Sequence, residues 1–262
     1  MMKNKYNLLG EKLGHSFSPI IHKEILNKYN DEDTYGLIEC QKEDLNKLIL
    51  DGKKGIYKGF NVTIPYKIEV MKYLDIIDSN ALKIGSVNTI LFKDNKAIGY
   101  NTDYDGFKEE ILHYNIDCNN KKAYILGTGG ASLSVSVVLK DLGSDVYFVS
   151  RNKKGENIIS YLELENRNID ILVNTTPVGM WPKIDDIPVN DKILSKSKIV
   201  IDIIFNPIKT KLLKASNSNY NGLYMLIAQA IKAEEIWHDN KKLVDVNEIY
   251  KKAGEIIHES IR

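Results

Sequence analysis

A strand, a glycine-rich turn, a helix and a second strand follow one another in residues 123–150, and this order constrains the fold more than any other feature. Ala123 to Leu126 is an apolar run typical of a buried strand, and the turn Gly127-Thr128-Gly129-Gly130-Ala131-Ser132 follows it directly. Residues 133–142 have the pattern of a helix that stops at Gly143, and 145–150 form the next strand. Such a unit predicts an α/β fold with a mostly parallel sheet.

The glycine turn also predicts a binding site. Glycine residues let the backbone approach a pyrophosphate, and the first turn of the helix behind them offers N–H groups and a positive partial charge. Ser132 occupies the third glycine position of the GxGxxG pattern, so the pattern is incomplete, although a small residue still allows close packing of the helix. We therefore expect a dinucleotide site, with a merely tight turn as the alternative.

The residues after the second strand indicate which dinucleotide. An NAD site usually carries an acidic residue here to bind the ribose 2′-hydroxyl, whereas this chain has Ser150-Arg151-Asn152-Lys153-Lys154. Arginine can grip a 2′-phosphate with two hydrogen bonds, and the lysines add positive charge. The pattern favours NADP, and an ordinary solvated loop is the alternative.

Strands and helices alternate along the rest of the chain, and 262 residues suit two medium domains. The patterns predict strands at residues 6–10, 35–40, 59–64, 86–92, 97–100, 169–174 and 198–204, and helices at 19–29, 42–50, from about 67, at 107–112, from 221 towards 237, and at 246–261. Asp94-Asn95-Lys96 is expected to form a tight turn between two strands.

Polar residues at predicted strand ends are the candidates for chemistry. In Asn61-Val62-Thr63-Ile64-Pro65-Tyr66-Lys67 the polar positions alternate with apolar ones, Pro65 ends the strand, and Lys67 lies just beyond it. Lys67 is then either a catalytic acid or a solvated lysine that opens a helix. Asp103 lies between a strand and a helix, where it is either functional or an N-cap.

Three further polar residues leave similar choices. Ser18 precedes a helix and is expected to cap it, whereas Ser16 has no obvious structural task. Gln229 lies among apolar helix residues, where a glutamine either satisfies backbone groups or reaches a ligand. His15 and His22 have no sequence partner that marks them as ligands or bases, and both are expected to be structural.

Composition excludes several functional classes. A formal net charge of +1 gives no electrostatic reason to expect nucleic acid or an anionic membrane as partner. Cys40 and Cys118 have neither disulfide-framework nor zinc-site spacing, so no metal is expected. The first ten residues lack the apolar core of a signal peptide, and no run approaches the length of a membrane span. We expect a cytoplasmic protein that binds a small molecule.

Seven ordered runs resemble those of the shikimate dehydrogenases, the NADP-dependent enzymes of aromatic amino-acid (chorismate) biosynthesis. The resemblance covers nearly the whole chain. The matching runs are His15 to Pro19, Asn61 to Lys67, Ser86 to Thr89, Asn101 to Asp103, Gly127 to Ser132, Asn174 to Met180, and Met225 with Ala228-Gln229-Ala230.

The resemblance implies two α/β domains separated by a cleft: a substrate domain of residues 1–103 plus 237–262 and a Rossmann-like NADP domain of residues 104–236. It implies reversible, NADPH-dependent reduction of 3-dehydroshikimate to shikimate, with Lys67 as general acid and base paired with Asp103. The implied substrate-binding residues are Ser16, Ser18, Asn61, Thr63, Lys67, Asn88, Asp103 and Gln229. The implied NADP-binding residues are Gly127, Thr128, Gly129, Gly130, Ala131, Ser150, Arg151, Asn152, Ile203, Gly222 and Met225.

Two residues and one segment depart from the family pattern. Phe205 replaces a common tyrosine, so one hydroxyl contact to substrate is expected to be missing, and Tyr224 replaces a common glycine, which is expected to narrow the nicotinamide region. The segment between Ser150 and Asn174 is short, which removes secondary contacts to the adenosine phosphate.

Two alternatives to this function stay open. One is a quinate/shikimate dehydrogenase that uses NAD, and the other is a non-catalytic module that binds a shikimate-like ligand. An acidic residue in place of Arg151 would have favoured the first, and loss of Lys67 or Asp103 would have marked the second. Either a monomer or a homodimer is compatible with the sequence.

Overall fold

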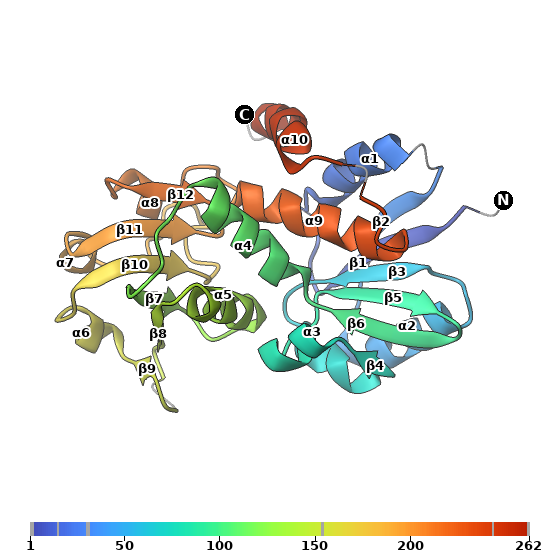
Figure 1. Cartoon of the computed structure of the whole chain (residues 1–262), viewed down its shortest axis with the longest axis horizontal. Helices are drawn as coiled ribbons and strands as arrows, with labels where there is room; N and C mark the ends of the chain where they lie inside the picture. The colour runs from blue at the N-terminus through green and yellow to red at the C-terminus, as the bar shows by residue number, and fades with distance from the viewer. Residues whose placement is uncertain (1–2, 15, 30–31, 153–154, 243, 261–262) are drawn as a thin grey trace. The chain divides into compact units, whose positions relative to one another are not determined.

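The computed structural model of the chain describes residues 3–14, 16–29, 32–152, 155–242 and 244–260. Its contacts divide the chain into two compact units. Unit 1 comprises Met1–Gly106 and Ile227–Ile257, and unit 2 consists mainly of Phe107–Leu226. Each unit is built on its own six-stranded sheet, which confirms the predicted α/β class with mostly parallel strands (Figure 1).

The sheet of unit 1 has the strand order β2-β1-β3-β5-β6-β4. Its strands are β1 (Lys5–Gly10), β2 (Thr34–Glu39), β3 (Gly59–Val62), β4 (Ile76–Ile77), β5 (Thr89–Lys93) and β6 (Lys96–Tyr100). The first three strands of this order run parallel, and β5 is antiparallel to both β3 and β6. Asp94 and Asn95 have φ angles of 52° and 58°, as a two-residue hairpin requires, which confirms the predicted turn.

Both faces of this sheet are covered. The helical segments of unit 1 are α1 (Ser18–Tyr29), η1 (Lys42–Asp44), α2 (Leu45–Lys53), η2 (Glu69–Tyr73), α3 (Ser79–Ile84), α10 (Val246–Ser260) and parts of α4 (Thr102–His113) and α9 (Leu223–Trp237). Phe60, Ile90 and residues of α2 and η2 form the core on one face. On the other face Tyr6 stacks on Trp237 of α9, with ring centroids 4.5 Å apart.

The sheet of unit 2 is parallel throughout, in the order β9-β8-β7-β10-β11-β12. Its strands are β7 (Lys122–Leu126), β8 (Asp145–Val149), β9 (Ile158–Ile159), β10 (Ile169–Asn174), β11 (Ser197–Asp202) and β12 (Asn219–Asn221). Chain order therefore proceeds outward in one direction from β7 and in the other from β10. Ligands of open α/β sheets bind at the carboxyl ends of strands at such a switch point.

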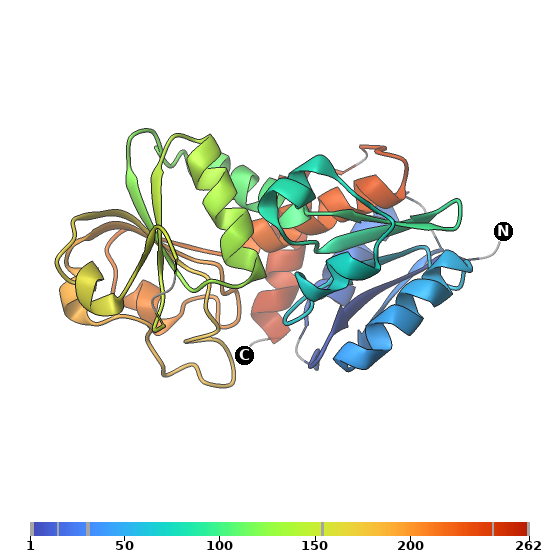
Figure 2. The ribbon, with the colours of Figure 1, turned by 90° about the horizontal axis from the view of Figure 1, so that it is seen from below.

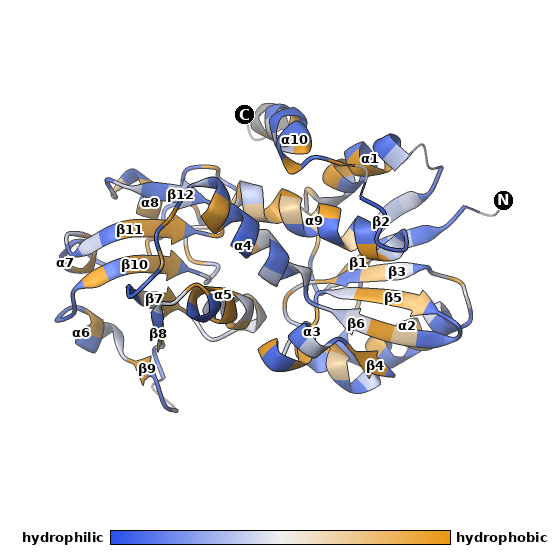
Figure 3. Ribbon diagram, in the orientation of Figure 1, coloured by the Kyte–Doolittle hydropathy of each residue, from blue (hydrophilic) through white to orange (hydrophobic). Residues whose placement is uncertain are grey.

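Helices lie on both faces of this second sheet. Its helices are α5 (Gly130–Asp141), α6 (Tyr161–Leu164), α7 (Asp191–Leu194) and α8 (Lys211–Lys214). The three short helices pack on the face that carries Tyr124, Leu172 and Val200, and α5 packs on β7 and β8 from the other side (Figure 2). Because both faces are covered, the central strands β7 and β10 are apolar at most of their positions (Figure 3).

Two local predictions are wrong. The helix expected from about Lys67 is only the short 3₁₀ segment η2, which starts at Glu69. Ser18 is not the N-cap of α1, because the carbonyl of Phe17 accepts the first intrahelical bonds from Ile20 and Ile21. His15 and the two lysines of the predicted 2′-phosphate loop, Lys153 and Lys154, lie outside the described residues.

Neither cysteine is exposed. Cys40 belongs to the core of unit 1, and Cys118 is buried in unit 2, where burial raises the pKa of its thiol to about 11. In the described ranges, no group of three His, Cys, Asp or Glu side chains could hold a metal ion. No helix among these residues is long and apolar enough to cross a membrane.

Candidate active site

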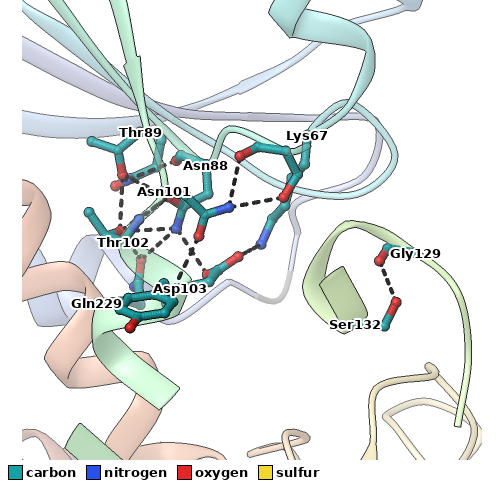
Figure 4. Close-up of polar contacts among 12 residues, drawn as sticks. Lys67, Asn88, Thr89, Asn101, Thr102, Asp103, Gly129, Ser132 and Gln229 are labelled. Carbon is teal, nitrogen blue, oxygen red and sulfur yellow. Dashed lines mark hydrogen bonds and ion pairs between the residues drawn. The ribbon is translucent and has the colours of Figure 1, made fainter. Parts of the chain in front are cut away.

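Lys67 and Asp103 form a largely buried ion pair in unit 1. Nζ of Lys67 lies 2.5 Å from Oδ2 of Asp103, and the two side chains are 14% and 7% exposed (Figure 4). The chain turns sharply after β3, and the carbonyl of Lys67 then accepts a hydrogen bond from the amide of Val87. This bond holds Lys67 next to the segment that leads into β5. The pair therefore places a cationic donor beside a carboxylate with little access to water.

Asn88 connects this pair to the rest of the cluster. Its Nδ2 donates to Oδ1 of Asp103 at 2.9 Å and to the hydroxyl of Thr102 at 3.0 Å, and its Oδ1 accepts from the amide of Thr102 at 2.7 Å. Oε1 of Gln229 lies 3.5 Å from both Asn88 Nδ2 and the Thr102 hydroxyl. We call Lys67, Asn88, Thr89, Thr102, Asp103 and Gln229 the polar cluster.

Thr89 and Thr102 were not expected at this site. Both are fully buried, and their hydroxyls lie 3.1 Å apart. Thr89 ends the run Ser86 to Thr89 and Thr102 lies within the run Asn101 to Asp103, so both belong to the polar runs of the sequence. Their hydroxyls give Asn88 and Gln229 fixed partners, so the amide groups are held in place.

Asn101, and not Asp103, caps helix α4. Oδ1 of Asn101 accepts a hydrogen bond from the amide of Tyr104, and its Nδ2 donates to the carbonyl and hydroxyl oxygens of Ser86. Asp103 lies in the first turn, where a negative charge is favourable next to the helix amino terminus. The N-cap alternative for Asp103 is therefore wrong, and its carboxylate is engaged with Lys67 and Asn88 instead.

The other predicted substrate residues of unit 1 differ in how they join this cluster. Asn61, which is 5% exposed, donates to the hydroxyl of Thr89 at 3.0 Å. Ser16 accepts a hydrogen bond from the amide of Ser18 at 3.3 Å, which gives it a structural task at the start of α1. Among the described residues, no hydrogen bond joins the side chain of Ser16 or Thr63 to the polar cluster.

In unit 2 the glycine turn lies at the switch point of the sheet. Gly127 has a φ angle of 103°, and Gly129 is the N-cap of α5. A side chain at Gly127 would press on Thr175 and Thr176, which follow β10. The hydroxyl of Ser132 donates to the carbonyl of Gly129 at 2.6 Å, so this residue fits the third glycine position without exposing its side chain (Figure 4). Thr128, Gly130 and Ala131 complete the turn and the start of α5.

These residues fit a dinucleotide. The turn leaves the first N–H groups of α5 at the carboxyl edge of β7, where a pyrophosphate is bound by helices of this kind. Ser150 follows β8, and its hydroxyl interacts with both the amide and the carbonyl of Asn152. Arg151 lies between them and is exposed, as a group that contacts a phosphate from solvent must be.

Three predicted cofactor residues gather around the start of α9. A side chain at Gly222 would overlap the backbone of Ile203, so only glycine allows this close approach. The amide of Met225 donates to Oε2 of Glu110 at 2.9 Å. Glu110 is fully buried, and burial raises the pKa of its carboxyl to about 8, so the acid is mostly protonated at neutral pH.

Tyr224 turns its ring towards α4. It is buried and stacks on His113, with ring centroids 4.0 Å apart and an interplanar angle of 18°. Phe205 is half-buried and has no hydroxyl to offer.

A second buried acid organises the ends of β10 and β11. Asp202 accepts hydrogen bonds from the Thr210 hydroxyl at 2.7 Å, from Asn174 Nδ2 at 3.0 Å and from the Ile204 amide at 3.2 Å. Burial raises the pKa of Asp202 to about 6 against these bonds, which act to lower it. Asn174 in turn accepts from the amide and hydroxyl of Thr176, so the loop after β10 is fixed at the switch point.

Unit 2 has a parallel sheet with a glycine turn at its switch point, and unit 1 carries a buried lysine–carboxylate pair. These two features place the protein in the dinucleotide-binding α/β class. The family described as "Shikimate dehydrogenase substrate binding domain" matches residues 8–90. A protein of Clostridium beijerinckii named shikimate dehydrogenase (NADP(+)) is 47% identical over 247 residues, covering 89% of this chain and 92% of its own. The chain belongs to the shikimate dehydrogenase family.

Solved structures agree with this assignment. Shikimate dehydrogenase 1 from Peptoclostridium difficile is 43% identical and superposes with a TM-score of 0.90, covering 96% of this chain and 98% of its own. A shikimate 5-dehydrogenase from Thermus thermophilus, in complex with NADP(H) and shikimate, is 25% identical with a TM-score of 0.86 and covers 96% and 99% of the two chains.

Proposed function

We propose that this protein is an NADP-dependent shikimate dehydrogenase that reversibly reduces 3-dehydroshikimate to shikimate. The observation that carries the proposal is the buried Lys67–Asp103 pair, 2.5 Å apart and tied by Asn88 to Gln229. The proposal is also supported by the 47% identity between this chain and the Clostridium beijerinckii protein named shikimate dehydrogenase (NADP(+)).

Lys67 acts as the general acid in reduction and as the general base in oxidation. NADPH supplies the hydride that is added to the carbonyl carbon of the substrate. The ammonium of Lys67 donates a proton to the carbonyl oxygen as negative charge develops there, and its positive charge stabilises that oxygen.

Asp103 keeps the lysine in position. One carboxylate oxygen faces Lys67 Nζ and the other is held by Asn88, so the acid cannot rotate away from the ammonium. Little water reaches either side chain, and the attraction between the two charges is stronger in such surroundings than in bulk solvent.

Unit 1 supplies the substrate site in this proposal. Hydroxyl and amide side chains are suited to a polyhydroxylated acid because they can both donate and accept hydrogen bonds. The proposed set is Ser16, Ser18, Asn61, Thr63, Lys67, Asn88, Asp103 and Gln229.

Unit 2 supplies the NADP site. The glycine turn Gly127 to Ala131 would hold the pyrophosphate, Ser150, Arg151 and Asn152 the 2′-phosphate, and Ile203, Gly222 and Met225 the nicotinamide end. The same proposal includes a substrate domain of residues 1–103 plus 237–262 and an NADP domain of residues 104–236. It also includes a cytoplasmic location and a monomeric or homodimeric state.

The decisive experiment follows absorbance of the reduced nicotinamide. Purified protein is mixed with shikimate or quinate and with NADP or NAD, in all four combinations. We expect rapid reduction with shikimate and NADP and much slower reduction in the other three. Comparable rates with NAD or quinate would assign the protein to the quinate/shikimate dehydrogenases, and ligand binding without turnover would show a non-catalytic module.

A further inference from the structure

In unit 1 the buried rings of His22 and Tyr35 stack next to Asn61. The imidazole of His22 in α1 lies flat on the ring of Tyr35 in β2, with centroids 3.7 Å apart and an interplanar angle of 7°. On its edge, Nδ1 of His22 is 2.6 Å from Oε1 of Glu234 in α9, and both side chains are fully buried. The ring of Tyr35 is therefore fixed by elements from three parts of the chain.

The hydroxyl of Tyr35 reaches the predicted substrate residues. Tyr35 and Asn61 lie on strands on either side of β1, two residues apart in register and on the same face of the sheet. The Tyr35 hydroxyl donates to Oδ1 of Asn61 at 2.8 Å. Burial and the nearby Glu234 raise the pKa of the phenol well above its ordinary value, against a hydrogen bond with Ser18, so the hydroxyl keeps its proton.

Asn61 is consequently held on both sides of its amide group. Nδ2 donates to the carbonyl of Asn88 at 3.3 Å and to the hydroxyl of Thr89 at 3.0 Å, while Oδ1 receives the Tyr35 hydroxyl. Both N–H bonds are used, so Oδ1 is the atom of this amide that can serve a ligand. A contact with Asn61 also acts to raise the pKa of His22 against the burial that lowers it to about 3, but a neutral imidazole whose Nδ1–H donates to Glu234 has no second N–H for Oδ1. A ligand hydroxyl can then donate to Asn61 without displacing the Tyr35 hydroxyl.

We propose that Tyr35 is a positioning residue for substrate binding, which fixes the Asn61 amide so that Oδ1 accepts a hydrogen bond from a hydroxyl of the substrate. This inference rests on the proposed function, because Asn61 matters to turnover only if a hydroxylated substrate binds unit 1. The buried pair of His22 and Glu234 holds the ring of Tyr35 in the orientation that aims its hydroxyl at Asn61.

The test is Tyr35→Phe, which removes the hydroxyl and keeps the ring that stacks on His22. We expect the KM for shikimate to rise about tenfold, the effect of one lost buried hydrogen bond, with the KM for NADP and kcat changed less than about twofold. Tyr29→Phe is the control, because it removes a tyrosine hydroxyl that donates to the carbonyl of Lys241 in the same unit. It should leave both KM values unchanged.

A double substitution separates positioning from general stability. If Tyr35 acts through Asn61, adding Tyr35→Phe to Asn61→Ala raises the KM for shikimate no further, whereas independent effects would multiply. If Asn61→Ala does not fold, the split between the two KM values in Tyr35→Phe decides alone. Equal changes in both KM values, or none, would overturn the inference, whereas a wild-type protein inactive with shikimate and NADP would overturn the proposed function as well.

Discussion

Each oxygen of the Asp103 carboxylate has its own donor, with Lys67 Nζ 2.5 Å from Oδ2 and Asn88 Nδ2 2.9 Å from Oδ1. Asp103 also lies in the first turn of α4, whose amino terminus favours negative charge. Asp103 therefore links helix α4, the segment before β5 that carries Asn88, and Lys67. The position of the ammonium is set by this carboxylate and depends little on the flexible lysine chain.

Replacing Lys67 should abolish most of the catalytic rate. For Lys67→Ala we expect kcat to fall about 10²–10⁴-fold, the usual contribution of a general acid, with less than tenfold change in the KM for shikimate. Lys72→Ala is the control, since Lys72 is an exposed lysine paired with Glu69. Steady-state kinetics give both values, and near-normal turnover in Lys67→Ala would remove this lysine from the mechanism.

Removing the cap of α4 should destabilise the protein. Asn101→Ala loses the bond to the Tyr104 amide and the two bonds to buried Ser86, so we expect the free energy of unfolding to fall by about 1–3 kcal/mol. Urea denaturation measures this change. The exposed Asn80 provides the comparison, and a loss in Asn101→Ala no larger than in Asn80→Ala would contradict the capping role.

Arg151 should decide between the two nicotinamide cofactors. Arg151→Ser removes the proposed partner of the 2′-phosphate, so we expect the KM for NADP to rise roughly 10–100-fold, the size of a charge-assisted hydrogen bond, and that for NAD to change little. Arg167→Ser removes the same charge elsewhere in unit 2 and serves as control. Equal changes in the KM for NADP and the KM for NAD would show that Arg151 does not bind the 2′-phosphate.

Glu110 should make stability depend on pH over a wide range. Its pKa is raised to about 8 in the folded protein from an ordinary 4.5, so the folded state holds this proton more tightly than the unfolded state. The resulting stabilisation is complete below pH 4.5 and is lost as pH rises through 8, at up to about 1.4 kcal/mol per pH unit. Glu110→Gln has no proton to lose, so its stability relative to wild type should increase over this window.

Asp202→Asn is a useful comparison for Glu110→Gln, because the pKa of Asp202 is raised only from 3.8 to about 6. Its stability relative to wild type should rise between pH 4 and 6 and stay level above that. Denaturation at several pH values separates the two windows. Curves for wild type and Glu110→Gln that run parallel from pH 5 to 8 would contradict the buried, protonated state of Glu110.

Much of unit 2 could be predicted because its signals are local. The strand at 169–174 and the segment β7–α5–β8 are set by apolar runs, glycine positions and a helix stop, all within a few residues of one another. The hairpin between β5 and β6 follows from Asp94 and Asn95 for the same reason.

Other features could not be read locally. The residues after Lys67 look helical by pattern but form only a 3₁₀ turn, because Val70 and Tyr66 are drawn into the core of unit 1. His22 and Glu234 are 212 residues apart in sequence, so nothing near either one indicates their contact. The polar runs indicate Asn88 and Asp103 as candidates, but which of Asn101, Thr102 and Asp103 caps the helix depends on Ser86 and Asn88, which lie in the segment that leads into β5.

The two buried cysteines give the wild-type chain one chemical reporter in each unit. Cys40 and Cys118 are 7% and 4% exposed, and burial raises the pKa of both thiols, so the reactive thiolate forms are scarce while each unit stays closed. A small alkylating reagent can modify either residue only when its surroundings open transiently. Mass spectrometry of the labelled peptides would therefore give an opening free energy for each unit separately, without an engineered probe.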